Sequence, residues 1–324
     1  MSDGQPVNLL VLPRLRVQNA NAIASPLTWG FPAMSAFMGF MHALERRLPA
    51  EQKLLFEQVG VICHDFQPQT ASAGYNLQQF NLTRNPVGKD GKTLGIAEEG
   101  RMHMEISLVF DVTESDDSSE AAARNLKKSE QEKIRLAAAI DDIVHGMRIA
   151  GGSVLPRTHQ RHKPQLIALS SNPDDAERTF RRLCRQLLPG FALVLNEQAL
   201  RERLEERRAT DPDTSPLDAW LDFSRLQHEC RIDEETGAGQ WQIRDKAGWL
   251  VPIPVGYRTL SAHEPGEVAR ARDPDVPFRF VEGIYSVGQW VSPHRLQSPQ
   301  ALMWYLDADP DNSIYRLNND YIDS

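Results

Sequence analysis

Cysteine is scarce in this sequence of 324 residues, which has only Cys63, Cys184 and Cys230. An odd number of widely spaced cysteines argues against a disulfide framework and against a cysteine-based zinc site, and it is typical of a reducing compartment. Long apolar runs are missing too, because none approaches the roughly 18 residues that a membrane helix needs. The first residues lack the positive segment and the cleavage site of a signal peptide. We therefore expect a cytoplasmic protein with no membrane partner.

The short motifs that carry most enzyme chemistry are also missing. The sequence has no P-loop, no GxGxxG, no HExxH, no GxSxG and no CxxC. His159 and His162 stand three residues apart, but no carboxylate or cysteine accompanies them as a metal site requires. We therefore expect no catalytic residue, no cofactor and no metal, and a protein that is not an enzyme.

Histidine keeps one catalytic alternative open. A metal-free ribonuclease needs a general base beside the cleaved phosphate, and the candidates here are His42, His64, His103 and His145. Each lies in an expected core element, where a structural histidine is the simpler interpretation. The aromatic RNA-reading strand of a standard RNA-recognition motif is absent as well. A metal-independent endoribonuclease is the alternative to a non-catalytic binding protein.

Positive charge is confined to the middle of the chain. The net charge is −8, residues 1–110 are neutral, and residues 148–208 carry twelve basic and seven acidic side chains. Residues 209–324 carry ten basic and nineteen acidic side chains. A protein that grips a short RNA needs only a local basic footprint, while an acidic tail suits a basic partner. Arginine outnumbers lysine by 28 to 8, which suits phosphate contacts but also follows from a GC-rich genome.

Hydrophobic periodicity and turn signals predict an α+β fold, and the order of elements is close to the ferredoxin-like βαββαβ plan with insertions. We expect residues 1–170 to form this core. The expected elements are a strand at 7–17, a loop at 18–32, a helix at 33–48, strands at 58–66, 80–91 and 102–110, a polar linker near 112–133, and a helix from the capping box of Ser129 and Glu132 to about 147.

Residues 171–324 are expected to pack on this core. Helices are predicted at 172–188, 197–208 and 216–226. The remainder is rich in proline, glycine and tryptophan and shows few periodic segments, so we expect an irregular C-terminal extension there.

Four segments have the residue types that bind RNA, because amides and arginines read splayed bases, aromatic rings stack on them, and glycines let a backbone approach a phosphate. Each segment also has a structural interpretation, as a capped turn, a hairpin tip, a helix end or a solvated helix face. The candidates are Arg14, Arg16, Gln18, Asn19, Asn21 and Trp29; Arg84, Asn85, Lys89 and Lys92; Arg148, Gly151, Gly152 and Ser153; and the helix face of Arg178, Arg181, Arg182 and Arg185.

Topology suggests how two of these segments relate. In a βαββαβ fold the second helix runs antiparallel to the strands it connects. We therefore expect the glycine pair Gly151-Gly152 and the loop of Asn19 and Asn21 to lie at opposite edges of the sheet. We also expect Gly152 to leave room for a phosphate.

Several longer segments resemble a known family. In chain order they are PRLRVQNANAIASPLTWGFP, FNLTRNP, EEGRMHMEISL, MRIAGGSVLP, LLPGFALV, IRDKAGWLVPIPVGY, GEVARARDPDVPFRFVE and SPHR. They resemble subunit two of the Csy complex, which is the type I-F CRISPR surveillance complex. This subunit is a Cas-five-type RAMP protein. The resemblance runs from about residue 7 to residue 305, and the first segment is the most specific.

This resemblance implies a modified ferredoxin-like (RRM/RAMP) fold and one copy per complex. It implies that the chain binds the 5′ handle of the guide RNA (crRNA), forms a heterodimer with the large subunit, and contacts the first copy of the repeated backbone subunit. Target DNA is engaged indirectly, for antiviral defence. Guide processing and target cleavage belong to other proteins in that system. A protein-only scaffold, with the acidic C-terminal region as its docking surface, is a third interpretation.

Overall fold

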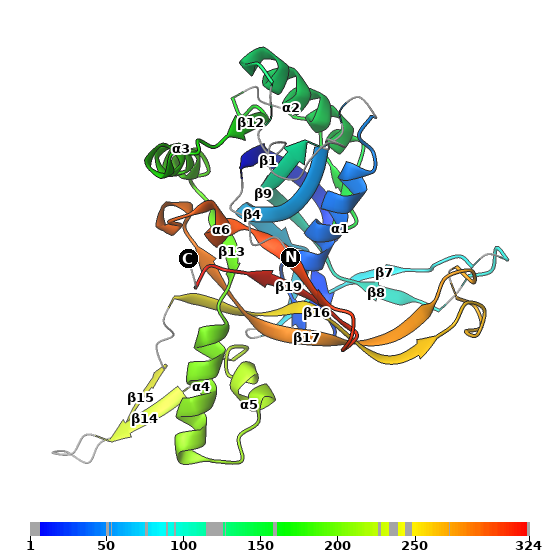
Figure 1. Ribbon diagram of the computed structural model, residues 1–324. Helices are drawn as coiled ribbons and strands as arrows, with labels where there is room; N and C mark the ends of the chain where they lie inside the picture. Colours follow the sequence, from blue (N-terminus) through cyan, green and yellow to red (C-terminus); the bar gives the residue numbers. More distant parts are fainter. Residues whose placement is uncertain are drawn as a thin grey trace.

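The protein is described here from a computed structural model (Figure 1). The described residues are 7–49, 52, 54–74, 77–88, 90–93, 95–114, 126, 128–157, 161–225, 228–232, 239–243, 248–271 and 273–322. No described helix is both long and apolar enough to cross a membrane.

The fold is of the α+β class, with one large antiparallel sheet and helices on both of its faces (Figure 1). The strands of the large sheet are β1 (Asn8–Asn21), β4 (Leu54–Pro68), β9 (Arg101–Glu114), β10 (Arg148–Ile149), β11 (Gly152–Val154), β12 (Gln165–Ala168), β13 (Phe191–Leu195), β16 (Trp249–His263), β17 (Phe278–Val291), β18 (Trp304–Asp309) and β19 (Ile314–Asn319). The helices are α1 (Met34–Glu45), α2 (Glu130–His145), α3 (Pro173–Gln186), α4 (Glu197–Thr210), α5 (Pro216–Leu221), α6 (Pro299–Leu302) and the 3-10 turn η2 (Pro293–Arg295).

The N-terminal half of the sheet has the strand order β12-β1-β9-β4, with every neighbouring pair antiparallel. β11 continues the edge formed by β12, because both pair with β1 at different heights. The first half of β1 is buried on both faces, as its apolar run predicts, since Leu10 and Leu12 face one hydrophobic cluster while Leu9 and Val11 face another.

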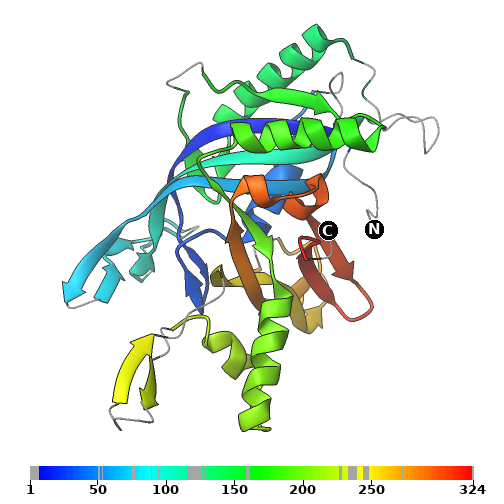
Figure 2. The ribbon, with the colours of Figure 1, turned by 90° about the vertical axis from the view of Figure 1, so that its left-hand side faces the viewer.

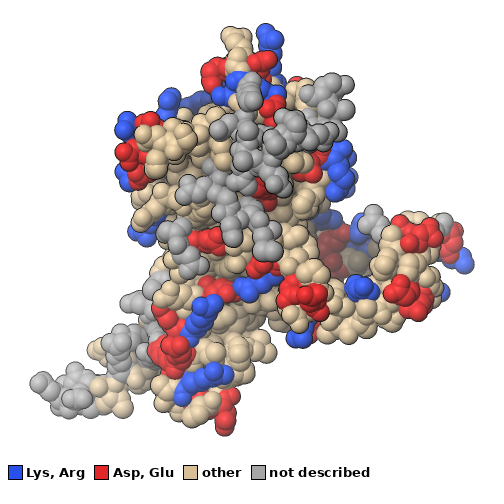
Figure 3. Space-filling model, in the orientation of Figure 1, with Lys and Arg blue, Asp and Glu red and all other residues tan. Residues whose placement is uncertain are grey.

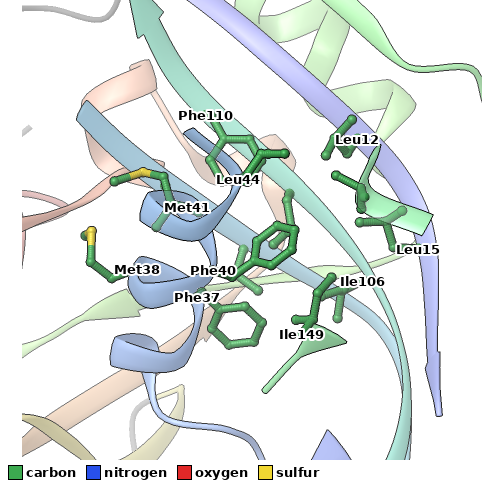
Figure 4. Close-up of a cluster of buried hydrophobic side chains, with 14 of the residues drawn as sticks. Leu12, Leu15, Phe37, Met38, Phe40, Met41, Leu44, Ile106, Phe110 and Ile149 are labelled. Carbon is green, nitrogen blue, oxygen red and sulfur yellow. The ribbon is translucent and has the colours of Figure 1, made fainter. Parts of the chain in front are cut away.

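Helices α1 and α2 cover one face of these strands, and their predicted apolar stripes form the larger core cluster. Phe40 of α1 packs against Phe110 of β9 with ring centroids 6.4 Å apart, and Phe37, Met41 and Leu44 belong to the same cluster (Figure 4). The capping box predicted at the start of α2 is confirmed, since Ser129 accepts from the backbone N–H of Glu132 while the Glu132 carboxylate accepts from that of Ser129. Of the linker expected near 112–133, residues 115–125 and 127 lie outside the described residues.

Helix α3 lies on the opposite face of the same strands (Figures 1 and 2). Its predicted N-cap is confirmed, because the Asn172 side chain accepts from the N–H groups of Asp174 and Asp175. Phe180 and Leu183 pack in a second cluster with Leu9 and Val11 of β1. This cluster covers only the first half of β1, and the second half carries polar side chains on this face.

The C-terminal part forms regular strands, so the expected irregular extension is wrong. β4 pairs with β13, β13 with β17, β17 with β16, β16 with β19, β19 with β18, and β18 again with β4 through Trp304 and Val59. These pairings close a ring of six strands that shares β4 with the N-terminal half. Trp304 is fully buried in it and donates its indole N–H to the carbonyl of Leu193 at 2.7 Å. The proposed boundary at residue 170 stays a prediction.

Paired strands also project beyond this body (Figure 1). One arm is the far end of β16 and β17, a second is inserted between β4 and β9, and a third lies to the left of α4 in Figure 1. The additional short strands are β2 (Ile23–Ser25) and β3 (Thr28–Trp29) after β1, β5 (Thr70–Gly74), β6 (Leu77–Phe80), β7 (Leu82–Arg84) and β8 (Ala97–Glu99) in the second arm, and β14 (His228–Ile232) and β15 (Gly239–Ile243) in the third.

Candidate nucleic-acid interface

The second half of β1 presents polar side chains on the face that α3 leaves uncovered. β-Bulges follow Leu12 and Val17, and between them Leu15 and Val17 turn inward while Arg16 and Gln18 are exposed. β1 therefore continues through residues 18–21, where a loop was expected. We define the polar face as this exposed surface of β1 with its neighbours on β9, β4, β10 and β11. Its residues are Arg16, Gln18, Asn19, Gln67, Gln69, Arg101, His103, Arg148 and Ser153.

Asn19 lies at the centre of a hydrogen-bond network on the polar face. Its backbone N–H donates to Nδ1 of His103 at 3.2 Å, and its carbonyl accepts from Nη1 of Arg101 at 3.1 Å. Its side-chain oxygen accepts from Nε2 of Gln69 at 3.3 Å. Asn19 has a φ of 57°, a conformation that asparagine tolerates better than most residues. Its side chain is therefore held at a fixed position on an open surface.

The glycine hairpin lies directly beside this network. β11 pairs with β1 through Gln18 and Ser153, and the N–H of Asn21 donates to the carbonyl of Ala150 at 2.9 Å. The expectation that the two segments lie at opposite edges of the sheet is therefore wrong. It failed because β11 and β12 together return along one edge of β1, which brings the hairpin to the end of β1 where Asn19 lies.

Gly152 has a structural reason to be glycine. A Cβ on this residue would lie 2.7 Å from both the Ala20 nitrogen and the Gln18 carbonyl oxygen. The space beside Gly152 is thus filled by the backbone of β1, so the expectation that Gly152 leaves room for a phosphate is wrong. Gly151, in contrast, is exposed with a φ of 78°, and a Cβ added to it would have only Nη1 of Arg101 within 4 Å, at 3.9 Å.

A groove of about 450 Å³ runs from this hairpin to the start of α1. Asn21, Arg148 and Gly151 line one side, and Ser35 and Tyr257 lie among the other lining residues. We call it the polar groove. α1 begins here with no side-chain cap from Ala33 and no acidic residue in its first turn. The first N–H groups of a helix attract anions, so the groove suits a phosphate at this end.

The Asn21 side chain is used by the protein itself. Its Oδ1 accepts from the N–H of Ile23 at 3.2 Å and its Nδ2 donates to the Ile23 carbonyl at 2.7 Å. The amide therefore stabilises the turn between β1 and β2, which is the structural interpretation that the sequence left open. RNA contact by Asn21 stays a prediction.

Arg14 also makes internal contacts. Its Nη1 bonds Oε1 of Glu105 at 2.8 Å, and its Nη2 donates to the carbonyls of Leu188 and Pro189 at 3.3 and 3.2 Å. Its side chain is only 19% exposed, because the segment after α3 covers it. Arg14 therefore connects β1 to that segment and lies at the margin of the polar face.

His64 belongs to the same internal cluster. Its Nδ1 lies 2.7 Å from the Pro189 carbonyl oxygen and its Nε2 lies 2.6 Å from Oγ of Ser107. Burial, with a smaller contribution from the charge of Arg14, lowers the pKa of His64 from 6.5 to about 4. Both ring nitrogens are engaged and the ring is neutral at physiological pH, so His64 has a structural role here.

Two predicted segments lie apart from the polar face. Arg84 is on β7 of the second arm, where it pairs with Glu99 at 2.8 Å, and Asn85 follows it as an exposed residue. Of the lysines proposed with them, Lys92 is exposed near Asp90, and Lys89 lies outside the described residues. Trp29, on β3, is 56% exposed and lies edge-on to Phe80 with ring centroids 5.5 Å apart.

The arginines of α3 do not form a stripe of one sign. Arg181 pairs with Glu177 at 2.5 Å, and Arg178 lies 3.6 Å from Asp175. Basic and acidic side chains accordingly alternate over α3 in Figure 3. Arg182 and Arg185 are exposed and make no ion pair within the described part of the chain. α3 packs on the first half of β1, apart from the polar face, and contact of its arginines with RNA stays a prediction.

Sequence reasoning did not assign four members of the polar face to RNA binding, which are Gln67, Gln69, Arg101 and His103. The signal for two of them was available, because Met102 and Met104 alternate with Arg101 and His103 along a strand. Burial of the methionines places the other two on the opposite face. Gln69 gave no such signal, since the bulge between Cys63 and Asp65 shifts the register of β4.

Known proteins resemble the chain over nearly its whole length. The family model described as CRISPR-associated protein (Cas_Csy2) matches residues 10–317. A protein of Pseudomonas aeruginosa (strain UCBPP-PA14), named CRISPR-associated protein Csy2, is 44% identical over 326 aligned positions, which cover 98% of this chain and 96% of the relative.

Proposed function

The chain belongs to the Csy2 family of CRISPR-associated proteins, subunits of the type I-F Csy complex, and from this membership we propose that it is a non-catalytic subunit that binds the 5′ handle of the guide RNA. The observation that carries the proposal is the polar face, where Arg16, Gln18 and Arg148 are exposed around the fixed side chain of Asn19. Such groups hydrogen-bond the edges of unstacked bases and the phosphates between them.

We propose further that β1, α1, β4, β9, α2 and β12 form a ferredoxin-like core of the RRM/RAMP kind. The strand order β12-β1-β9-β4 and the placement of α1 and α2 on one face support this. RNA-recognition domains with this plan bind single strands on the face opposite their helices. The polar face lies on that side of the sheet.

Other subunits are expected to cover much of the remaining surface. We propose that the chain pairs with the large subunit as a heterodimer, contacts the first copy of the backbone subunit, and meets target DNA indirectly, in the cytoplasm. Large apolar side chains on the arms support this, among them Trp241 at 73% and Ile232 at 70% exposure. Exposed apolar patches of this kind mark protein interaction sites.

The alternative, a metal-independent endoribonuclease, would need a histidine free to act as a base. His103 is the candidate nearest the polar face, and its Nδ1 already accepts from the N–H of Asn19. His145 lies in α2, where Nδ1 is 2.7 Å from the carbonyl of Asp141. These engagements favour binding without cleavage.

The test is co-expression with the neighbouring genes of its operon, followed by photocrosslinking and sequencing of the RNA that co-purifies. We expect crosslinks from the 5′ end of a repeat-derived RNA to peptides of β1, β9 and the β10–β11 hairpin. RNA crosslinked only to other subunits would contradict the proposal and favour the protein-only scaffold. Cleavage of a repeat RNA by the purified chain, lost in His103→Ala, would favour the endoribonuclease.

A further inference from the structure

An aromatic cleft of about 290 Å³ opens beside the polar groove. We define it by the rings that line it, which are those of Trp29, Phe31, Phe66, Trp249 and Trp290. No charged side chain is among its described lining residues. Its volume is at the lower end of the range for small-molecule pockets, about 300–1,000 Å³, which suits one flat ring better than a folded segment.

The rings of the cleft are exposed and yet held in place. Trp29, Trp249 and Phe66 are 56%, 48% and 44% exposed. Trp249 is fixed by the edge of Phe191, with centroids 5.4 Å apart, and Trp29 by Phe80 at 5.5 Å. Aromatic side chains that are rigid and solvent-exposed lose little conformational entropy when a ligand covers them. They form a prepared surface for stacking.

The cleft adjoins the polar groove. Ala24, Pro32 and Ala33 line both cavities, so they share one wall. On the far side of that wall lie Arg148 and the uncapped start of α1. A polynucleotide has this alternation of an apolar ring and an adjacent phosphate, whereas an apolar peptide side chain has no anion to place in the groove.

We propose that the aromatic cleft binds one flipped-out nucleobase of the guide RNA, with its phosphate in the polar groove. The inference rests on the proposed RNA-binding function and adds a site to it. Because the cleft offers rings and almost no polar side chain, it holds a base by stacking and tolerates changes of base identity. Base preference arises instead on the polar face.

The experiment uses the complete complex, assembled with guide RNAs in which 2-aminopurine replaces one handle nucleotide at a time. At one handle position we expect quenched fluorescence that recovers in Trp29→Ala and in Trp249→Ala. RNA dissociation constants should rise about 5- to 150-fold in these variants, as loss of one stacked base predicts. Trp249→Phe should retain most of the affinity, and Leu217→Ala, which changes a 54% exposed apolar side chain of α5 outside the cleft, should change neither readout.

Two outcomes overturn the inference. Quenching that is absent at every position, or that is unaffected by both variants while a thermal melt shows them folded, excludes a base in the cleft. Loss of a protein subunit from the complex with unchanged 2-aminopurine signals identifies the cleft as an anchor for a protein side chain. In both cases the polar face can still crosslink to RNA, whereas failure of the proposed function removes those crosslinks as well.

Discussion

The backbone N–H of Asn19 donates to Nδ1 of His103 across neighbouring strands at 3.2 Å. The bond exists because the bulge after Val17 turns Asn19 into a left-handed conformation with a φ of 57°. That same turn leaves the Asn19 amide on the surface with its oxygen bound to Gln69. An irregularity of the strand therefore sets the position of the amide that we expect to meet RNA.

Asn19→Gly should separate the backbone role of Asn19 from its side-chain role. Glycine keeps the positive φ without strain, so the melting temperature should change little. Removal of the amide should relax base preference at one or two handle positions, at a cost of about 1–3 kcal/mol by analogy with amide contacts to DNA bases. Fluorescence anisotropy of the complex with single-base handle variants measures this. A uniform loss of affinity for every variant would contradict base contact.

Arg16→Gln with Arg148→Gln should weaken RNA binding through phosphates. Each phosphate contact to a single strand contributes about 0.7 to the slope of log K against log salt, so the slope should fall by about 1.4 if both arginines bind phosphate. The matched control is Arg46→Gln with Arg47→Gln, which changes two exposed arginines beyond the C-terminal end of α1. An equal slope in both double variants would exclude these phosphate contacts.

Gly152→Ala should destabilise the fold, because the new methyl group would meet the backbone of Gln18 and Ala20 at 2.7 Å. Overpacking of this kind costs about 1–3 kcal/mol. Gly39→Ala is the control, since a Cβ at this position in α1 meets nothing within 4 Å, and alanine in a helix is favoured over glycine by about 1 kcal/mol. The urea concentration at the midpoint of unfolding should therefore fall in Gly152→Ala and rise in Gly39→Ala.

Asp222→Asn should be strongly destabilising. The Asp222 side chain is 1% exposed and its carboxylate lies within 3.1 Å of the guanidinium groups of Arg203, Arg207 and Arg225. Removing the buried anion takes one ion pair from each of these arginines, which are 14%, 29% and 62% exposed, and breaking a buried pair costs about 3–5 kcal/mol. Asp175→Asn removes the exposed partner of Arg178 and should cost less than about 1 kcal/mol. Thermal melts in which the two variants match would show that the cluster is solvated.

Stability should fall as pH drops from 6.5 to about 4 because of His64. The pKa of His64 is lowered to about 4 in the folded protein, so the unfolded chain binds this proton first and acid favours unfolding. The expected loss is about 1–3 kcal/mol over this window. His64→Gln should flatten this part of the stability curve, while His294→Gln, at an exposed position, should not. Stability curves of the same shape against pH for both variants would show that His64 does not cause the loss of stability in acid.

Local patterns predicted the elements whose burial follows one period. α1 and α2 were predicted because their apolar residues recur at helical spacing, and β9 because Met102, Met104 and Ile106 alternate with polar residues. β16 escaped prediction, since Pro252 and Pro254 interrupt its alternation and both of its faces are partly buried. Its pairing with β17 and β19 comes from the closed ring, which no local period reveals.

The candidate site was only partly predictable for the same reason. Gln18, Asn19, Arg148 and Ser153 were chosen by residue type, and the pairing of β11 with β1 brings them together. That pairing joins segments more than a hundred residues apart, so sequence reasoning placed them at opposite edges. Arg14 has a suitable residue type as well, but the segment after α3 covers it.

The two edges of β4 find their partner strands at different times during synthesis. One edge of β4 pairs with β9 soon after it emerges, but the other edge waits for β13, and the ring closes only when Trp304 reaches Val59. A nascent or truncated chain that ends before Trp304 therefore carries an unprotected strand edge. Such an edge pairs readily with other chains, so β18 protects the part of β4 around Val59 from aggregation.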